Sequence, residues 1–123
     1  SHDHSGGISF TMDGGSSAIS TGQKGFVIVP YSGTITSWMI IADTTGSIVV
    51  DVWKTDYNSY PPSVANTITG SEKPTLSSAN KNRDLALSTW TTSFSAGDIF
   101  TINVDSVATV RKVTLLLQTI KLD

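Results

Sequence analysis

The sequence predicts an all-β domain, an antiparallel β-sandwich of jelly-roll type with one long loop. Ser and Thr account for 35 of the 123 residues, and only 15% of the residues are charged. This bias suits sheet faces and polar loops and argues against a helical bundle. Seven or eight short apolar or alternating segments follow one another at a spacing of roughly ten residues, which is typical of sandwiches. A chain of this length makes one core, so we expect a single domain over residues 8–123, with residues 1–7 as a linker or the end of a preceding segment.

The expected strands end at Gly, Pro or Asp, residues that favour turns. They are residues 8–12, 25–29, 34–42, 47–54, 84–94, 99–104 and 110–122. In the last of them Val113, Leu115 and Leu117 share one face, and Leu116, Ile120 and Leu122 share the other. A strand that is apolar on both faces needs cover on both, so we expect a second sheet on one side and a neighbouring subunit on the other.

The centre of the fold is predicted to be a β-hairpin formed by residues 38–42 and 47–54. Both segments are rich in β-branched residues, which fit a pleated and buried surface. Residues 43–46 join them, and a turn of this length often ends in a left-handed residue, which Gly46 adopts at least cost. The hairpin leads directly into Trp53 and Lys54 and then into the long loop.

Residues 55–83 are expected to form that loop, because they contain Pro61, Pro62, Gly70 and Pro74 and few apolar residues. Pro62 suits the first position of a short helical turn through residues 63–66. A connection of this length is unusual, and such loops commonly carry function or cover a sheet edge.

Several classes of function lack support in the sequence. There is no cysteine, and the two histidines lie at positions 2 and 4, so no nucleophile–base triad can be assembled within the fold. We expect the carboxylates of Asp51, Asp84, Asp98 and Asp105 to accept hydrogen bonds from backbone amides in turns. A catalytic pair of carboxylates is the alternative. We therefore expect no enzyme and no catalytic residues. A net charge of −2 gives no basis for nucleic-acid binding, and no apolar run is long enough for membrane insertion.

His2 and His4 form the one pattern typical of a metal site. Residues i and i+2 of an extended chain point to the same side, so both imidazoles can face one point. Two ligands are too few for a closed site, but three copies around a threefold axis supply six nitrogens, which suits iron, nickel or zinc. The alternative is an unstructured terminus or tag-derived residues. No cofactor is otherwise required.

The second candidate site is the start of the long loop, with Trp53, Asp56, Tyr57, Asn58 and Tyr60. A sugar site needs aromatic rings for the apolar C–H faces and polar groups for the hydroxyls. The alternative is that both tyrosines only pack the loop onto the sandwich.

The run GQKGFVIVPYSGTITSWMIIADTTGSIVVDVWK, followed by YPP, SEKPTLSS and AGDIFTINVDS, resembles a β-sandwich module of tail and tail-fibre proteins of tailed bacteriophages. The likeness covers about residues 21–122. The upstream His-x-His is similar to the metal-threading motif of trimeric phage fibres and spikes.

This resemblance implies a virion protein, a homotrimer in contact with other tail proteins, and attachment to a glycan on the host surface. We expect Trp38, Met39, Leu116 and Ile120 to provide the subunit contact. Two other functions stay open. One is a purely structural virion domain, in capsid decoration or a tail scaffold, and the other is an extracellular bacterial carbohydrate-binding module.

Overall fold

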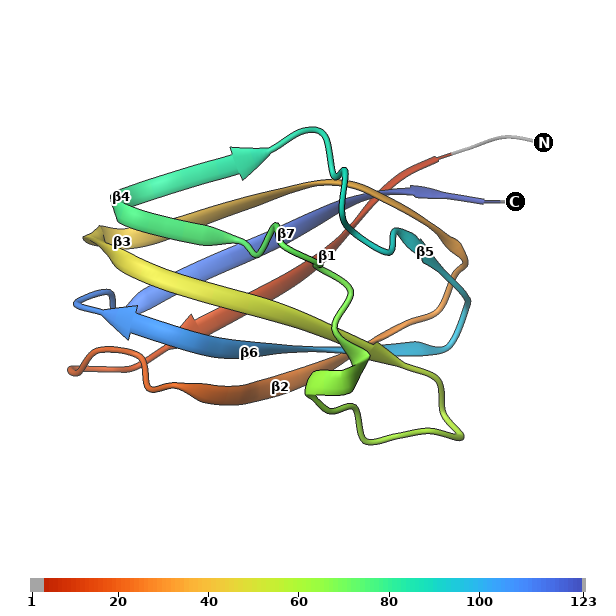
Figure 1. The fold of residues 1–123 in the computed structure, drawn as a ribbon, viewed down its shortest axis with the longest axis horizontal. Helices are drawn as coiled ribbons and strands as arrows, with labels where there is room; N and C mark the ends of the chain where they lie inside the picture. The colour runs from red at the N-terminus through yellow and green to blue at the C-terminus, as the bar shows by residue number, and fades with distance from the viewer. Residues whose placement is uncertain (1–3, 123) are drawn as a thin grey trace.

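The protein is described by a computed structural model that covers residues 4–122, and it is an all-β fold in which all paired strands run antiparallel (Figure 1). The strands are β1 (His4–Asp13), β2 (Gly22–Val29), β3 (Gly33–Thr55), β4 (Thr75–Asp84), β5 (Ser93–Phe94), β6 (Asp98–Ala108) and β7 (Lys112–Lys121). A single 3₁₀ turn, η1 (Val64–Asn66), lies in the loop between β3 and β4 at the place expected for a helical turn. The predicted fold class is confirmed.

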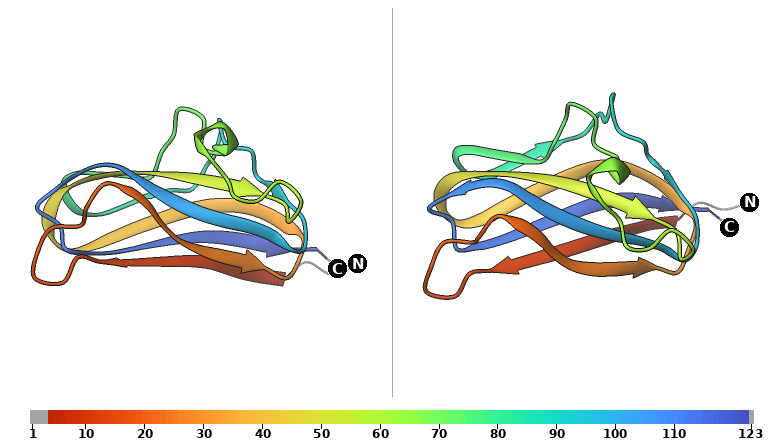
Figure 2. Two further views of the ribbon diagram at one scale, coloured as in Figure 1. Left: turned by 90° about the horizontal axis from the view of Figure 1, so that it is seen from below. Right: turned by 60° about the horizontal axis from the view of Figure 1, so that its bottom comes forward.

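The long strand β3 organises the two layers. Residues 33–42 pair with β7, and residues 47–55 pair with β6. β4 pairs with both parts of β3 and bends with it, at Ser78, whose φ of 48° is left-handed. β1 extends one layer beside β7, and β2 extends the other beside β6. Strands that bend from one layer into the next make the corner of a sandwich, and Figure 2 shows the resulting curled, half-barrel shape.

The predicted hairpin is wrong in its pairing. The chain does fold back near residues 43–46, but each half of β3 pairs with a different strand. Gly46 does not have a left-handed φ. A Cβ at this position would lie 2.7 Å from both the Ala108 carbonyl oxygen and Val110 Cγ1. Glycine is therefore needed because the turn between β6 and β7 crosses the bend at close range.

The core lies between the layers and follows the expected alternation. Val113, Leu115 and Leu117 of β7 are buried, as are Phe100 and Ile102 of β6. Burying one such side chain contributes about 1.5–3 kcal/mol. The opposite face of β7 is only partly covered, because Leu116 is half-buried and Ile120 is exposed, as is Leu122 directly after the strand.

Three segments differ from the expected boundaries. β4 lies within the expected loop except for its last residue, and its sequence is polar because nine of its ten residues are exposed or half-exposed, while hydrogen bonds to β3 hold it. Residues 84–94 were expected to form one strand, but Asp84 is the last residue of β4 and only Ser93 and Phe94 form β5. β1 begins at His4, so residues 4–7, expected in a linker, pair with residues 118–121 of β7.

Both ends of the described chain lie together, because His4 pairs with Lys121. The loop that follows β3 lies at this same end, and the bend of β3 and β4 lies at the other end (Figures 1 and 2). Within residues 4–122, no helix has the length and apolar character to cross a membrane.

Candidate ligand groove

An open groove of about 520 Å³ lies between β2 and the loop that follows β3. Phe26 and Ile28 of β2, together with Ile99 of β6, form its sheet side. Tyr57, Asn58 and Tyr60 form its loop side. Its volume falls within the usual range of small-molecule sites, which are mostly apolar with a few polar groups.

The register of β2 explains why two large apolar side chains face outward. Phe26 pairs with Thr101 and Ile28 pairs with Ile99, so these two residues share one face, while Val27 and Val29 point to the core. A bulge between Gln23 and Phe26 resets the register. The Thr101 hydroxyl lies 2.6 Å from the Lys24 carbonyl oxygen and 2.8 Å from that of Gly25, and it stabilises the bulge by hydrogen bonding.

Aromatic rings connect the two sides of the groove. Phe26 and Tyr60 meet edge to face, with ring centroids 5.2 Å apart and an interplanar angle of 62°. This is a favourable geometry for an aromatic pair. The exposed fractions remain large, at 46% for Phe26, 47% for Tyr60 and 84% for Tyr57. Three rings are therefore available to a ligand.

Asp56 shapes the loop that carries the tyrosines. Its carboxylate accepts a hydrogen bond of 2.8 Å from the Ser59 backbone N–H, which is the usual role of aspartate at the start of a turn. The Tyr60 N–H also donates to the Tyr57 carbonyl, at 3.4 Å. These bonds close a compact turn that places Tyr57, Asn58 and Tyr60 along one side of the groove.

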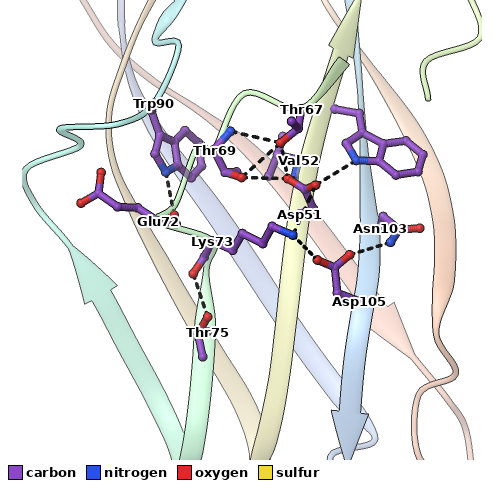
Figure 3. Close-up of polar contacts among 11 residues, drawn as sticks. Asp51, Val52, Thr67, Thr69, Glu72, Lys73, Thr75, Trp90, Asn103 and Asp105 are labelled. Atoms are coloured by element: carbon purple, nitrogen blue, oxygen red, sulfur yellow. Dashed lines mark hydrogen bonds and ion pairs between the residues drawn. The ribbon is translucent and has the colours of Figure 1, made fainter. Parts of the chain in front are cut away.

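A buried carboxylate fixes the far end of the same loop to the sheet (Figure 3). Asp51 of β3 is 2% exposed. Its Oδ1 accepts hydrogen bonds from the hydroxyls of Thr67 and Thr69, at 2.6 and 2.8 Å, and from the Val52 backbone N–H at 2.9 Å. A buried carboxylate needs such donors, because an unpaired buried charge costs more than an unpaired buried amide or hydroxyl, for which the cost is already about 2–7 kcal/mol.

Lys73 connects Asp51 to β6. Its ammonium lies 2.6 Å from Asp105 Oδ2 and 3.8 Å from Asp51 Oδ2, and the Asn103 amide donates to the other oxygen of Asp105. The hydrogen bond to Asp105 raises the pKa of Lys73, with the charges of Asp105 and Asp51 adding to it against a lowering by burial. The loop between β3 and β4 is thus bound to both strands on the outer face of this layer.

The structure brings together three of the five residues proposed for ligand binding. Tyr57, Asn58 and Tyr60 line the groove, and Asp56 supports the turn behind them. Trp53 does not line the groove. It is half-buried, and its indole N–H donates to Asp51 Oδ2 at 3.1 Å, so it belongs to the buried network.

Phe26 and Ile28 were missed as site residues. The segment GFVIV was interpreted only as a strand, although every residue from Phe26 to Val29 is apolar. Alternate residues of a strand face opposite sides of the sheet. An unbroken apolar run therefore places apolar side chains on the outer face of the strand as well as in the core, which indicates a contact or binding surface there.

The four residues proposed for a subunit interface lie on two different faces. Met39 of β3 pairs directly with Leu116 of β7, and Met39 and Ile120 are 43% and 38% exposed. Trp38 is adjacent to Met39, so it points the other way and is buried in the core at 5% exposure. Trp38 therefore does not reach this outer face, where a second groove of about 470 Å³ is lined by Met39, Ile41, Lys81, Asn82 and Arg83.

The histidine pair cannot be assembled from the described part of the chain. His2 lies outside the described residues, and His4 opens β1. Among residues 4–122 no group of three or more His, Cys, Asp or Glu side chains is arranged to hold a metal. A metal on a threefold axis stays a prediction.

Comparisons with known proteins do not assign a family. No protein-family model matches the chain, and no curated protein matches it significantly. Among solved structures, a chain of the Cyanophage Pam1 capsid asymmetric unit is similar over 99% of this chain and 84% of that one, with 14% identity and a TM-score of 0.30. A chain in the structure of the infectious bursal disease virus Gx strain is similar over 98% of this chain and 40% of that one, with 9% identity and a TM-score of 0.31. Scores this low support no conclusion about fold or function.

Proposed function

We propose that this protein is a non-enzymatic binding module of a bacteriophage virion, and that the groove beside β2 binds a carbohydrate on the host surface. The observation that carries the proposal is the exposed set of three rings, Phe26, Tyr57 and Tyr60, around an open groove. The resemblance of residues 21–122 to tail and tail-fibre modules supports the virion location.

The chemistry of the groove suits a sugar ring. A pyranose has one face of C–H groups, which packs against an aromatic ring, and a rim of hydroxyls, which need donors and acceptors. The phenol groups and the Asn58 amide supply both kinds of hydrogen bond. The edge-to-face contact with Phe26 holds Tyr60 in place before a ligand arrives, which lowers the entropic cost of binding.

A structural virion domain without a ligand is the second candidate, and a different surface favours it. Met39 and Leu116 lie opposite each other on the outer face of β3 and β7, and Ile41 is 48% exposed beside them. Exposed apolar side chains in a row are typical of protein contacts. This surface fits the proposed trimer or another virion protein. An extracellular carbohydrate-binding module would use the groove in the same way.

The proposal is tested by glycan-array binding and by adsorption to host cells. We expect Tyr57→Ala and Tyr60→Ala to lower both signals at least tenfold, because each removes an aromatic ring from the groove and a loss of about 1.4 kcal/mol in binding free energy is already tenfold. Leu85→Ala is the matched control, because Leu85 is 67% exposed and does not line the groove. If both tyrosine variants bind like the wild type, the groove is not the site and the structural function is favoured.

A further inference from the structure

We infer that the groove beside β2 selects neutral saccharides over acidic ones such as uronates. The inference rests on the proposed carbohydrate function and specifies its substrate class. It comes from the charges in and around the groove, which are independent of the ring geometry that suggests a sugar.

The groove itself provides no positive charge to an anion. Its described lining consists of three aromatic rings, two isoleucines and one amide, from Asn58. Transfer of a sugar carboxylate from water onto such a surface loses hydration without a compensating ion pair.

The nearest charged residue along the loop is acidic. Asp56 precedes Tyr57 directly and is exposed. Its Oδ1 already accepts the hydrogen bond from Ser59 that forms the turn, so the carboxylate stays at the base of the tyrosine-bearing loop. A sugar carboxylate packed on Tyr57 would approach a like charge, and close like charges repel each other.

Two lysines flank the groove residues in the sequence, and both are engaged elsewhere. Lys24, two positions before Phe26, donates to the Ser20 hydroxyl at 2.9 Å. Lys54 donates to the Ser93 carbonyl at 2.8 Å and lies 3.8 Å from Asp98. Recruiting either ammonium to an acidic ligand would break these contacts, and Lys54 is only 20% exposed.

The polar groups of the groove instead match hydroxyls. A phenol both donates and accepts a hydrogen bond, and an amide offers two donors and two acceptor positions. Neutral hydroxyls are satisfied by such groups at little desolvation cost, whereas a carboxylate takes up only the donors.

The experiment compares tetrasaccharides that differ only at C6, where the neutral sugars carry a hydroxymethyl group and the uronates a carboxylate. Wild-type protein is titrated with glucose, galactose and mannose tetrasaccharides, and with the glucuronate, galacturonate and mannuronate tetramers of the same linkage, at about 0.15 M salt. We expect at least one neutral tetramer to bind at least tenfold more tightly than its uronate counterpart. Asp56→Asn keeps the oxygen that accepts from Ser59 and removes the charge, so it should narrow that ratio at least threefold. Leu85→Asn serves as the control and should leave the ratio unchanged.

The outcomes separate the two proposals. If the uronates bind with an affinity equal to or higher than that of the neutral tetramers, the neutral selectivity is overturned. If Tyr57→Ala abolishes this uronate binding, the groove is still the carbohydrate site. Absence of binding by all six tetramers and by the glycan array overturns the carbohydrate function and this inference with it. A preference for neutral sugars that Asp56→Asn leaves intact overturns the charge explanation.

Discussion

Phe26 on edge strand β2 and Tyr60 in the loop after β3 meet edge to face, with ring centroids 5.2 Å apart. This contact joins two segments that are otherwise held by different parts of the sheet. β2 is held by β6 through the bulge at Thr101, and the loop is held by Asp51 and Lys73. The groove is thus formed by a rigid scaffold on both sides, which suits a binding surface.

Removing the carboxylate of Asp51 should destabilise the protein strongly. Asp51→Ala removes the acceptor of the buried Thr69 hydroxyl, of the half-buried Trp53 indole and of the Thr67 hydroxyl, and we expect the free energy of unfolding to fall by about 2–4 kcal/mol. Urea denaturation measures this change. Asp56→Asn, in the exposed part of the same loop, should stay within about 0.5 kcal/mol of the wild type. If Asp51→Ala also lowers the free energy of unfolding by less than about 0.5 kcal/mol, the hydrogen bonds of Asp51 do not hold the loop to the sheet.

Gly46 should be intolerant of any side chain. In Gly46→Ala the new Cβ meets the Ala108 carbonyl oxygen, a backbone atom that cannot move alone, and we expect a loss of about 1–3 kcal/mol in the free energy of unfolding. Gly25→Ala is the matched control on β2, because no atom outside its neighbours lies within 4 Å of that Cβ. Equal stability of the two variants would contradict the close crossing of the turn between β6 and β7.

Asp43 should make part of the stability depend on pH. Its Oδ1 accepts the backbone N–H groups of Lys112 and Arg111, both at 3.1 Å, and these bonds hold the pKa of Asp43 below its usual value of 3.8. A depressed carboxyl pKa adds stability above the unfolded pKa, and this stability is lost as the pH falls through the folded pKa.

Urea denaturation of wild type and Asp43→Asn at pH 7 and pH 2.5 tests this effect. We expect Asp43→Asn to be less stable than the wild type at pH 7, and the difference to shrink at pH 2.5. A difference that is the same at both pH values would show that the charge of Asp43 contributes nothing.

The outer face of β3 and β7 should control assembly. If Met39 and Leu116 form the proposed subunit contact, light scattering at micromolar concentration should give three times the 13.0 kDa mass of the chain. Met39→Lys places a charge into that contact and should yield the monomer, whereas Leu85→Lys should leave the mass unchanged. A wild-type mass of 13.0 kDa would contradict the trimer.

The sequence was informative wherever burial determined residue type. Val113, Leu115 and Leu117 alternate with less buried neighbours, and the structure places them on the core face as expected. β4 could not be predicted, because its pairing depends on the bend of β3 and its own residues are mostly exposed and polar. Gly46 was expected to serve a left-handed turn, because local sequence does not reveal that the turn between β6 and β7 crosses there.

Only the loop side of the candidate site could be predicted from the sequence, because the sheet side depends on how distant strands are ordered. Tyr57, Asn58 and Tyr60 are neighbours in sequence, so their chemistry could be recognised as a set. Phe26 and Ile28 join them only through the order of strands, which puts β2 at the edge of the sheet next to the loop. Trp53 looked like a member of the set, but its alternation on β3 placed its indole beside Asp51.

The most direct test of the carbohydrate groove is a map of the binding surface by NMR. The neutral oligosaccharide with the strongest glycan-array signal is titrated into ¹⁵N-labelled protein while backbone amide shifts are recorded. We expect the largest changes at residues 26–28 and 57–60, and none of similar size at Met39 or Leu116. Changes that cluster on the outer face of β3 and β7, or no changes at saturating sugar, would contradict the assignment of the groove as the ligand site.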